Sequence, residues 1–278
     1  MISAVVVTVD AAVGFAFLLV ALRFCAFAEN TKHSRHAKIA ADFIRFVFIA
    51  FFISKSARII LSYSEMQKRR LQVRRLGRFG YDEGLVLQKK LEQEVIEQRE
   101  QDYLLLLEHP HTFTIGRRAK ENGVLATAEK LKTLGAAVFE TNRGGKVTYH
   151  GIGQIVGYPI INLSPDREDV HQYVRDLEEV LIRTMADFGI EAFRIEGLTG
   201  VHTREGKVAA IGVHLKRWVT THGFALNVNT DLSFFDWIIA CEGEPVSSME
   251  RLLGRELDLA EVEDRIIENF AEIFGNEK

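Results

Sequence analysis

Four consecutive leucines at positions 104–107 constrain the fold of this chain more than any other feature of its sequence. They follow Tyr103 and are followed at once by the polar residues Glu108 and His109, so the apolar run is short. Successive side chains of a strand point to opposite faces of its sheet, and an unbroken apolar run therefore predicts a strand buried on both faces.

The chain of 278 residues changes character near Met66. Residues 1–65 hold two strongly apolar stretches, but Asp10 interrupts the first, and an acid near the centre of a spanning helix costs about 2.5–3.5 kcal/mol. Arg45 and Lys55 break the second stretch, and no positive charge precedes the first, as a secretory signal would require. Three interpretations stay open: a start assigned too early, with translation beginning at Met66; a membrane-associated amphipathic segment; or a membrane span. We predict a hydrophobic N-terminal extension over 1–65, whose membrane contact is left open, and one compact domain over 66–278.

The charge and cysteine content exclude several classes of protein. A formal net charge of -3 gives no electrostatic reason to expect nucleic-acid binding. Cys25 and Cys241 are the two cysteines of the chain, which argues against a disulfide framework and a structural zinc site and fits a reducing compartment such as the cytoplasm. His109-Pro-His111 is the only short-spaced pair among His109, His111, His171, His202, His214 and His222, and its proline interrupts any regular element. We expect no metal.

Beyond Met66, short apolar runs alternate with periodic segments. The runs predict strands at 71–76, 103–109, 112–117, 136–141, 146–150, 154–163 and 220–229. The helical periodicity predicts helices at 81–100, 169–188 and 259–274. Residues 200–218 predict a hairpin that turns at Glu205-Gly206 and places Lys207 at the start of its second strand. Strands come in runs with few helices between them, which favours an α+β domain: a mixed sheet with helices packed on one side.

Three segments are candidates for chemistry, and each has a structural alternative. Residues 143–154 read RGGKVTYHGIGQ; the glycines indicate either tight turns around a short strand or a strand that lies against a ligand. Lys207 precedes small apolar residues, so it is either an ordinary surface charge or a cation beside a ligand. Cys241 lies where an apolar run gives way to polar residues, and it is either a small buried side chain or an accessible nucleophile.

Together these segments resemble the lipoyl(octanoyl) transferase family. Residues 143–154 look like its RGG-x-VTYHGPGQ signature, and residues 206–212 (GKVAAIG) and 222–229 (HGFALNVN) follow in the family's order. The segment around Cys241 comes next, and residues 108–117 resemble the family's earlier EHP…TxGR stretch. The resemblance covers about residues 71–253, and as a set these blocks are specific.

The resemblance implies a fold shared with biotin and lipoate protein ligases and a transfer of octanoyl from octanoyl-acyl carrier protein, with no cofactor. The implied acceptors are lysines on lipoyl domains, in the E2 subunits of 2-oxoacid dehydrogenases and in the glycine cleavage H protein. It assigns Cys241 as the nucleophile and Lys207 as its partner. The residues that it implies for the acyl and thioester pocket are Arg143, Gly144, Gly145, Lys146, Val147, Thr148, Tyr149, His150, Ala210, Ile211, Gly212, Gly223, Phe224 and Ala225.

Elementary chemistry supports the implied pair. A free cysteine is only about 3% thiolate at pH 7, and an ammonium ~4 Å away contributes ~4 kcal/mol at an effective dielectric constant of about 20. The chain departs from the family in reading Ala240-Cys241-Glu242 where the family has Pro-Cys-Gly. A Glu242 carboxylate that faced Lys207 would raise the pKa of the thiol, and we expect it to face solvent.

Two other functions fit the same residues. An ATP-dependent lipoate or biotin ligase would need no nucleophilic cysteine, although residues 146–148 look closer to the transferase pattern than to the SGGGAVYHD of the ligases. A non-catalytic acyl-binding protein is the second alternative, and Glu242 is the residue that motivates it.

Overall fold

The computed structural model describes residues 70–98, 101–119, 123–239 and 245–275, all within one compact unit, Lys68–Lys278. The predictions about residues 1–65 and about Cys241 itself fall outside these residues. No helix in the described ranges is long and apolar enough to cross a membrane.

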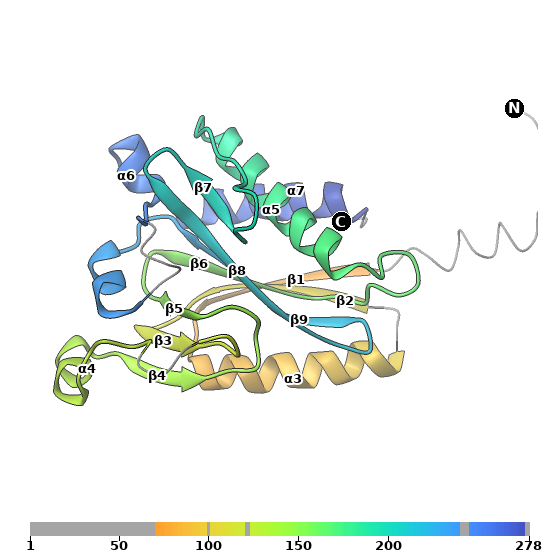
Figure 1. The fold of residues 1–278 in the computed structure, drawn as a ribbon. Coiled ribbons are helices and arrows are strands. Elements are labelled where there is room, and N and C mark those ends of the chain that lie inside the picture. Colours follow the sequence, from red (N-terminus) through yellow and green to blue (C-terminus); the bar gives the residue numbers. More distant parts are fainter. Residues whose placement is uncertain (1–69, 99–100, 120–122, 240–244, 276–278) are drawn as a thin grey trace, which may run out of the picture. The chain divides into compact units, whose positions relative to one another are not determined.

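The larger of two sheets has six strands in the order β1-β2-β6-β9-β8-β7 (Figure 1). Strand β1 pairs in parallel with β2, and the other neighbours are antiparallel. The mixed sheet predicted from the sequence is confirmed. The strands span Arg70–Arg78 (β1), Gln101–Glu108 (β2), Gln154–Ile160 (β6), Val201–Thr203 (β7), Gly206–Lys216 (β8) and Val219–Asn227 (β9).

Helices cover both faces of this sheet, with α3 on one side and α5 and α7 on the other (Figure 1). The leucines of β2 show why: Leu104 and Leu106 pack with the apolar sides of α5 and α7, whereas Leu105 and Leu107 pack with α3. The prediction of helices on one side is therefore wrong, since a strand with no polar face needs cover on both. The helices span Tyr81–Gln98 (α3), Val170–Asp187 (α5) and Leu259–Phe274 (α7).

The ends of α5 and α7 follow from capping residues in the sequence. Asp169 accepts hydrogen bonds from the backbone N–H groups of His171 and Gln172, and Asp258 does the same for Ala260. Such side chains satisfy donors that the first helical turn leaves unpaired. The apolar stripes of these helices then pack together against the sheet.

A second sheet of three strands, in the order β4-β3-β5, was not predicted as a separate sheet. Strand β3 (Thr112–Ile115) lies between β4 (Ala137–Glu140), which is parallel to it, and β5 (Val147–His150), which is antiparallel. Its core is aromatic: Phe113 and Tyr149 pack with Phe234. The short elements around it and beyond are α4 (Ala128–Leu134), the 3-10 helix η1 (Leu232–Trp237) and α6 (Met249–Leu253).

Candidate active site

A cavity of about 240 Å³ lies where strand β5 and the loop before it face strands β8 and β9. The loop at residues 197–199, which follows α5, completes one wall. The predicted residues that line it are Arg143, Gly145, Lys146, Val147, Thr148, His150, Lys207, Ala210, Ile211, Gly212, Gly223, Phe224 and Ala225. The structure thus brings residues from three separate parts of the sequence to one cavity.

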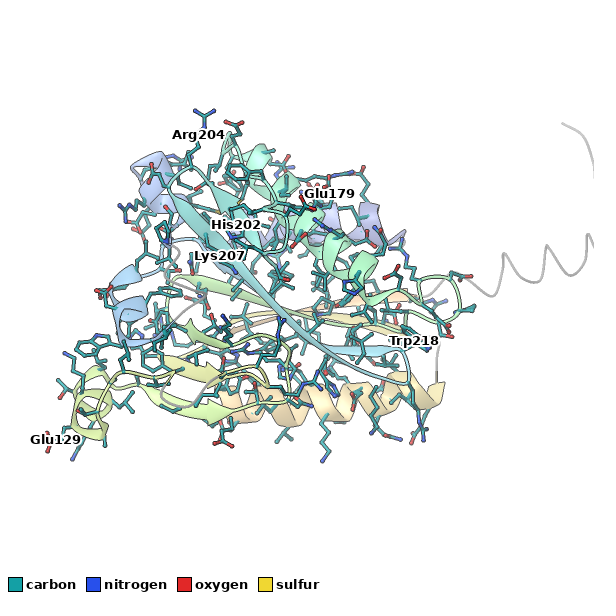
Figure 2. All side chains as sticks on the ribbon, in the orientation of Figure 1. Glu129, Glu179, His202, Arg204, Lys207 and Trp218 are labelled. Atoms are coloured by element: carbon teal, nitrogen blue, oxygen red, sulfur yellow. The ribbon has the colours of Figure 1, made fainter. Side chains whose placement is uncertain are left out.

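Lys207 begins its strand as the sequence predicted, opposite His202 of β7 (Figure 2). Only 8% of it is exposed, and its Nζ donates a hydrogen bond of 2.7 Å to the carbonyl oxygen of Thr199. Gly200 (φ +125°) allows this contact, because a Cβ there would lie 2.6 Å from the Lys207 Cε. The ammonium is therefore held at the cavity wall, unlike the mobile ammonium of a surface lysine.

The backbone of Lys207 also holds the segment that follows Cys241. Its N–H donates to the carbonyl of Pro245 at 2.8 Å, and its own carbonyl accepts from the N–H of Ser247 at 3.0 Å. These two bonds form a short parallel bridge between Lys207 and Val246. Cys241 precedes Pro245 by four residues and lies outside the described part of the chain.

Strand β5 contributes Val147, Thr148 and His150 to the cavity lining, whereas the Tyr149 ring packs on the opposite side, with Phe234. The Tyr149 hydroxyl lies 2.7 Å from the Nδ1 of His111, within the small aromatic core. Tyr149, which the resemblance assigned to the pocket, is placed away from the cavity because neighbouring side chains of a strand point in opposite directions.

Gly144, also assigned to the pocket, is not among the residues that line the cavity, and it links the loop before β5 to strand β8. Its N–H donates to the carbonyl of Val213 in β8 at 2.9 Å, and its carbonyl accepts from the Nη1 of Arg143 at 3.0 Å. A Cβ at Gly212 would come within 2.9 Å of the Gly144 carbonyl oxygen. Glycine at position 212 thus allows the close approach of the two backbones.

Arg143 lies 93% buried at the cavity, and its guanidinium is fixed by the neighbouring strand. The Nη2 atom donates to the carbonyl and the hydroxyl of Thr114, at 2.7 and 2.8 Å, and Nε donates to the same hydroxyl at 3.3 Å. Burial is the main cause that lowers the pKa values of His150 and His222, and the positive charge of Arg143 lowers them further.

The hydrogen bonds of His150 define its tautomer. The amide nitrogen of Gln154 donates to the carbonyl of Tyr149 and to Oδ1 of Asn227, so its Oε1 is the acceptor that faces the imidazole. His150 Nδ1 therefore carries the hydrogen and donates to Gln154 at 2.9 Å. Burial is the main reason why the pKa of His150 lies well below its usual value, so the ring is neutral and its Nε2 is an acceptor.

Beyond His150, an aromatic wall closes the cavity. Tyr81 stacks on His150 and contacts His109 edge-on. His109 donates from Nδ1 to a backbone carbonyl and accepts at Nε2 from the Tyr158 hydroxyl, both at 2.7 Å. Burial lowers the pKa of His109 to about 4 and that of His222 to about 3, so this wall carries no charge at neutral pH.

Several residues that line the cavity could not be predicted from the sequence. Tyr81, Tyr158 and Arg118 line the cavity, as do residues 197–199. Arg118 directly follows Arg117, the last residue of the TxGR stretch, but Tyr81 and Tyr158 come from α3 and β6, and no local pattern marks them. No group of His, Cys, Asp or Glu in the described ranges could hold a metal ion.

Comparison with known proteins now gives the family. Residues 80–271 match the lipoyl protein ligase A/B catalytic domain. The chain belongs to this family. It is 52% identical to the octanoyltransferase of Solibacter usitatus over 206 residues, which are 74% of this chain and 93% of that protein. It is 48% identical to the octanoyltransferase of Rubrobacter xylanophilus over 219 residues, which are 76% of this chain and 98% of the relative. The family predicted from the sequence blocks is confirmed.

Solved structures confirm the fold. The bi-partite lipoate protein ligase of Thermoplasma acidophilum, described with its E2 lipoyl domain, has a TM-score of 0.58 at 18% identity and covers 76% of this chain and 85% of its own. Lipoate-protein ligase A bound with ATP has a TM-score of 0.56 at 17% identity over 76% of this chain and 87% of its own. These ligases share the fold, whereas the relatives with high sequence identity are octanoyltransferases.

Proposed function

We propose that this protein transfers an octanoyl group from octanoyl-acyl carrier protein to a lysine of a lipoyl domain, by way of a thioester on Cys241. The observation that carries the proposal is Lys207, a buried ammonium fixed 2.7 Å from a carbonyl at the wall of the cavity. The sequence identity to octanoyltransferases extends over most of the chain and supports the same reaction.

The chain around Lys207 supports the assignment of Cys241. Pro245 and Ser247 are bound to the Lys207 backbone, and four residues of chain reach at most about 14 Å. This short connection between residue 241 and the Lys207 backbone supports the assignment of Cys241 as the partner of Lys207. A reducing cytoplasm would keep this thiol free, and we place the reaction there.

The proposed steps conserve atoms and charge. The Cys241 thiolate attacks the carbonyl carbon of the donor thioester, the acyl–sulfur bond of the donor breaks, and the departing carrier thiolate takes a proton from the Lys207 ammonium. The neutral amine of the acceptor lysine then attacks the Cys241 thioester. Its proton passes to Lys207, the thiolate of Cys241 leaves, and the ion pair is restored. Neither step needs ATP, because in each step the acyl group starts as a thioester and is therefore already activated.

The cavity suits a short acyl chain. Its volume of about 240 Å³ is below the ~300–1,000 Å³ of pockets for drug-sized ligands. Ala210, Gly212 and Ala225 give its sheet wall small side chains, so an extended and slender part of the donor can lie against the sheet. The acceptors we propose are the lipoyl domains of 2-oxoacid dehydrogenase E2 subunits and the glycine cleavage H protein.

The test is an acyl adduct measured by intact mass spectrometry. The full chain is incubated with octanoyl-acyl carrier protein and no ATP, and we expect one octanoyl adduct on the wild type and on Cys25→Ala. The adduct should be absent in Cys241→Ala. Adding an apo lipoyl domain should discharge the adduct and acylate the domain. An adduct of equal size in Cys241→Ala, or an absolute need for ATP, would contradict the proposal.

A further inference from the structure

The cavity has an unusual charge pattern that the acyl chain does not explain. The described residues that line it include four cations, Arg118, Arg143, Lys146 and Lys207, and no carboxylate. An alkyl chain offers no partner to cations. A wall of one charge sign concentrates anions, so part of the ligand that binds here should be negatively charged.

The imidazoles of the wall do not change this balance. His150 and His222 are neutral at pH 7, since burial and the charge of Arg143 lower their pKa values. The positive charge therefore comes from the arginines and lysines. Lys207 is assigned to the thiol chemistry and Arg143 is bound to Thr114, which leaves Arg118 and Lys146 without a role in the proposed steps.

Arg118 and Lys207 approach the cavity from different ends. The Arg118 N–H donates to the carbonyl of Gly145 at 3.0 Å, and the neighbouring Gly144 is bound to Val213. Val213 follows Lys207 by six residues along β8, a rise of about 20 Å. Arg118 is exposed, whereas Lys207 is buried, so a long ligand can have its reacting end at Lys207 and a charged end at Arg118.

We infer that Arg118, assisted by Lys146, binds the phosphate of the phosphopantetheine arm that carries the donor's acyl thioester. This inference rests on the proposed function, because it takes the donor to be a carrier-linked thioester. Such an arm has the thioester at one end and a phosphate at the other, with a pair of amide units between them. A guanidinium at the exposed end of the cavity can donate two parallel hydrogen bonds to phosphate oxygens.

A nucleotide offers the same phosphate chemistry, so the test must separate the two sources. Binding of three probes to the full chain is measured by calorimetry: 4′-phosphopantetheine, pantetheine and AMP. We expect the wild type to bind phosphopantetheine about tenfold more tightly than pantetheine, the size of one charge-assisted contact. AMP should bind more weakly than phosphopantetheine.

Two neighbouring arginines give matched variants. Arg118→Ala should abolish the preference for the phosphorylated arm, and Arg118→Lys should retain part of it. Arg117→Ala should leave the preference unchanged, since Arg117 is exposed outside the cavity lining and its charge acts on His214. With octanoyl-phosphopantetheine as donor, Arg118→Ala should raise KM about tenfold with little change in kcat, and octanoyl-pantetheine should show no such effect.

Several results would overturn the inference: equal binding of the two arms to the wild type, equal losses in the Arg117 and Arg118 variants, or an Arg118-dependent preference for AMP. The binding experiment is repeated in Cys241→Ala, which removes the proposed nucleophile. A missing octanoyl adduct on the wild-type protein would refute the proposed function alone, while the binding preference measured in Cys241→Ala still decides the role of Arg118.

Discussion

Replacing Gly200 with alanine tests how far catalysis depends on the position of the Lys207 ammonium. Gly200 has φ +125°, a conformation that costs other residues about 1–3 kcal/mol. An added Cβ would also lie 2.5 Å from the carbonyl oxygen of Ala209 and 2.6 Å from the Cε of Lys207. The Ala209 contact is with backbone and cannot be relieved by a rotamer change. The lysine side chain, or the loop that carries Thr199, must therefore move.

The expected effects on stability and activity can be separated. Strain and overpacking together should lower the free energy of unfolding by roughly 2–4 kcal/mol. A displacement of about 1 Å at a catalytic group can reduce the rate ~100-fold, so we expect that loss in the rate of adduct formation. Urea unfolding measures the first quantity, and stopped reactions followed by intact mass measure the second, under conditions where the variant is folded.

Gly189→Ala is the matched control. Gly189 also has a positive φ, of +76°, but a Cβ there meets nothing within 4 Å, and the residue lies at the end of α5. This variant should lose about 1 kcal/mol of stability and retain its rate. If Gly200→Ala lost no more activity than Gly189→Ala, the contact between Gly200 and Lys207 would have no role in holding the ammonium, and the reasoning would be refuted.

Three further predictions concern the surroundings of the cavity. The pKa of His109 is lowered from 6.5 to about 4, so as the pH falls the unfolded chain takes up a proton before the folded chain does. This group should therefore lower the free energy of unfolding by about 3 kcal/mol between pH 6.5 and 4. Urea unfolding of His109→Gln should show a shallower dependence on pH. Gly157→Ala would place a Cβ 2.1 Å from the Phe224 ring and should lower the free energy of unfolding by roughly 2–3 kcal/mol. In a double-mutant cycle, the same substitution should lower it much less when Phe224 is replaced by leucine. Equal losses in both backgrounds would contradict the contact. Tyr149→Phe removes a hydrogen bond to His111, so it should lower the free energy of unfolding by about 1 kcal/mol and change kcat/KM by no more than about twofold. A large loss of activity would instead show that Tyr149 acts in the cavity.

The elements with strong periodicity could be predicted from the sequence alone. The turn before Lys207 and the strand that it begins were predicted correctly, because a glycine after polar residues and a run of small apolar residues are local signals. The helix at 170–187 begins after Asp169 for the same kind of reason. The four leucines of β2 also indicate helices on both faces of the sheet, since a strand with apolar side chains on both sides needs cover on both.

The remaining features depend on contacts between distant residues. The separate sheet of β3, β4 and β5 consists of strands of four residues each, and short strands carry no signal of which partner they will pair with. Tyr158 and His109 are far apart in sequence and meet through one hydrogen bond. The resemblance implied a pocket lined by every residue from 143 to 150, but the Tyr149 ring packs with Phe234, on the other side of β5 from Thr148 and His150.

The bridge between Lys207 and Val246 has a mechanical consequence. Two backbone hydrogen bonds attach the segment just after Cys241 to the residue that we propose as its partner. A fluctuation that tilts or shifts β8 therefore carries the end of that segment with it. Lys207 and Val246 share one support, so the distance between them should vary less than the distance of either from the opposite wall of the cavity. Thermal motion of β8 would then mainly change the width of the cavity and would largely preserve the spacing of Lys207 and Val246.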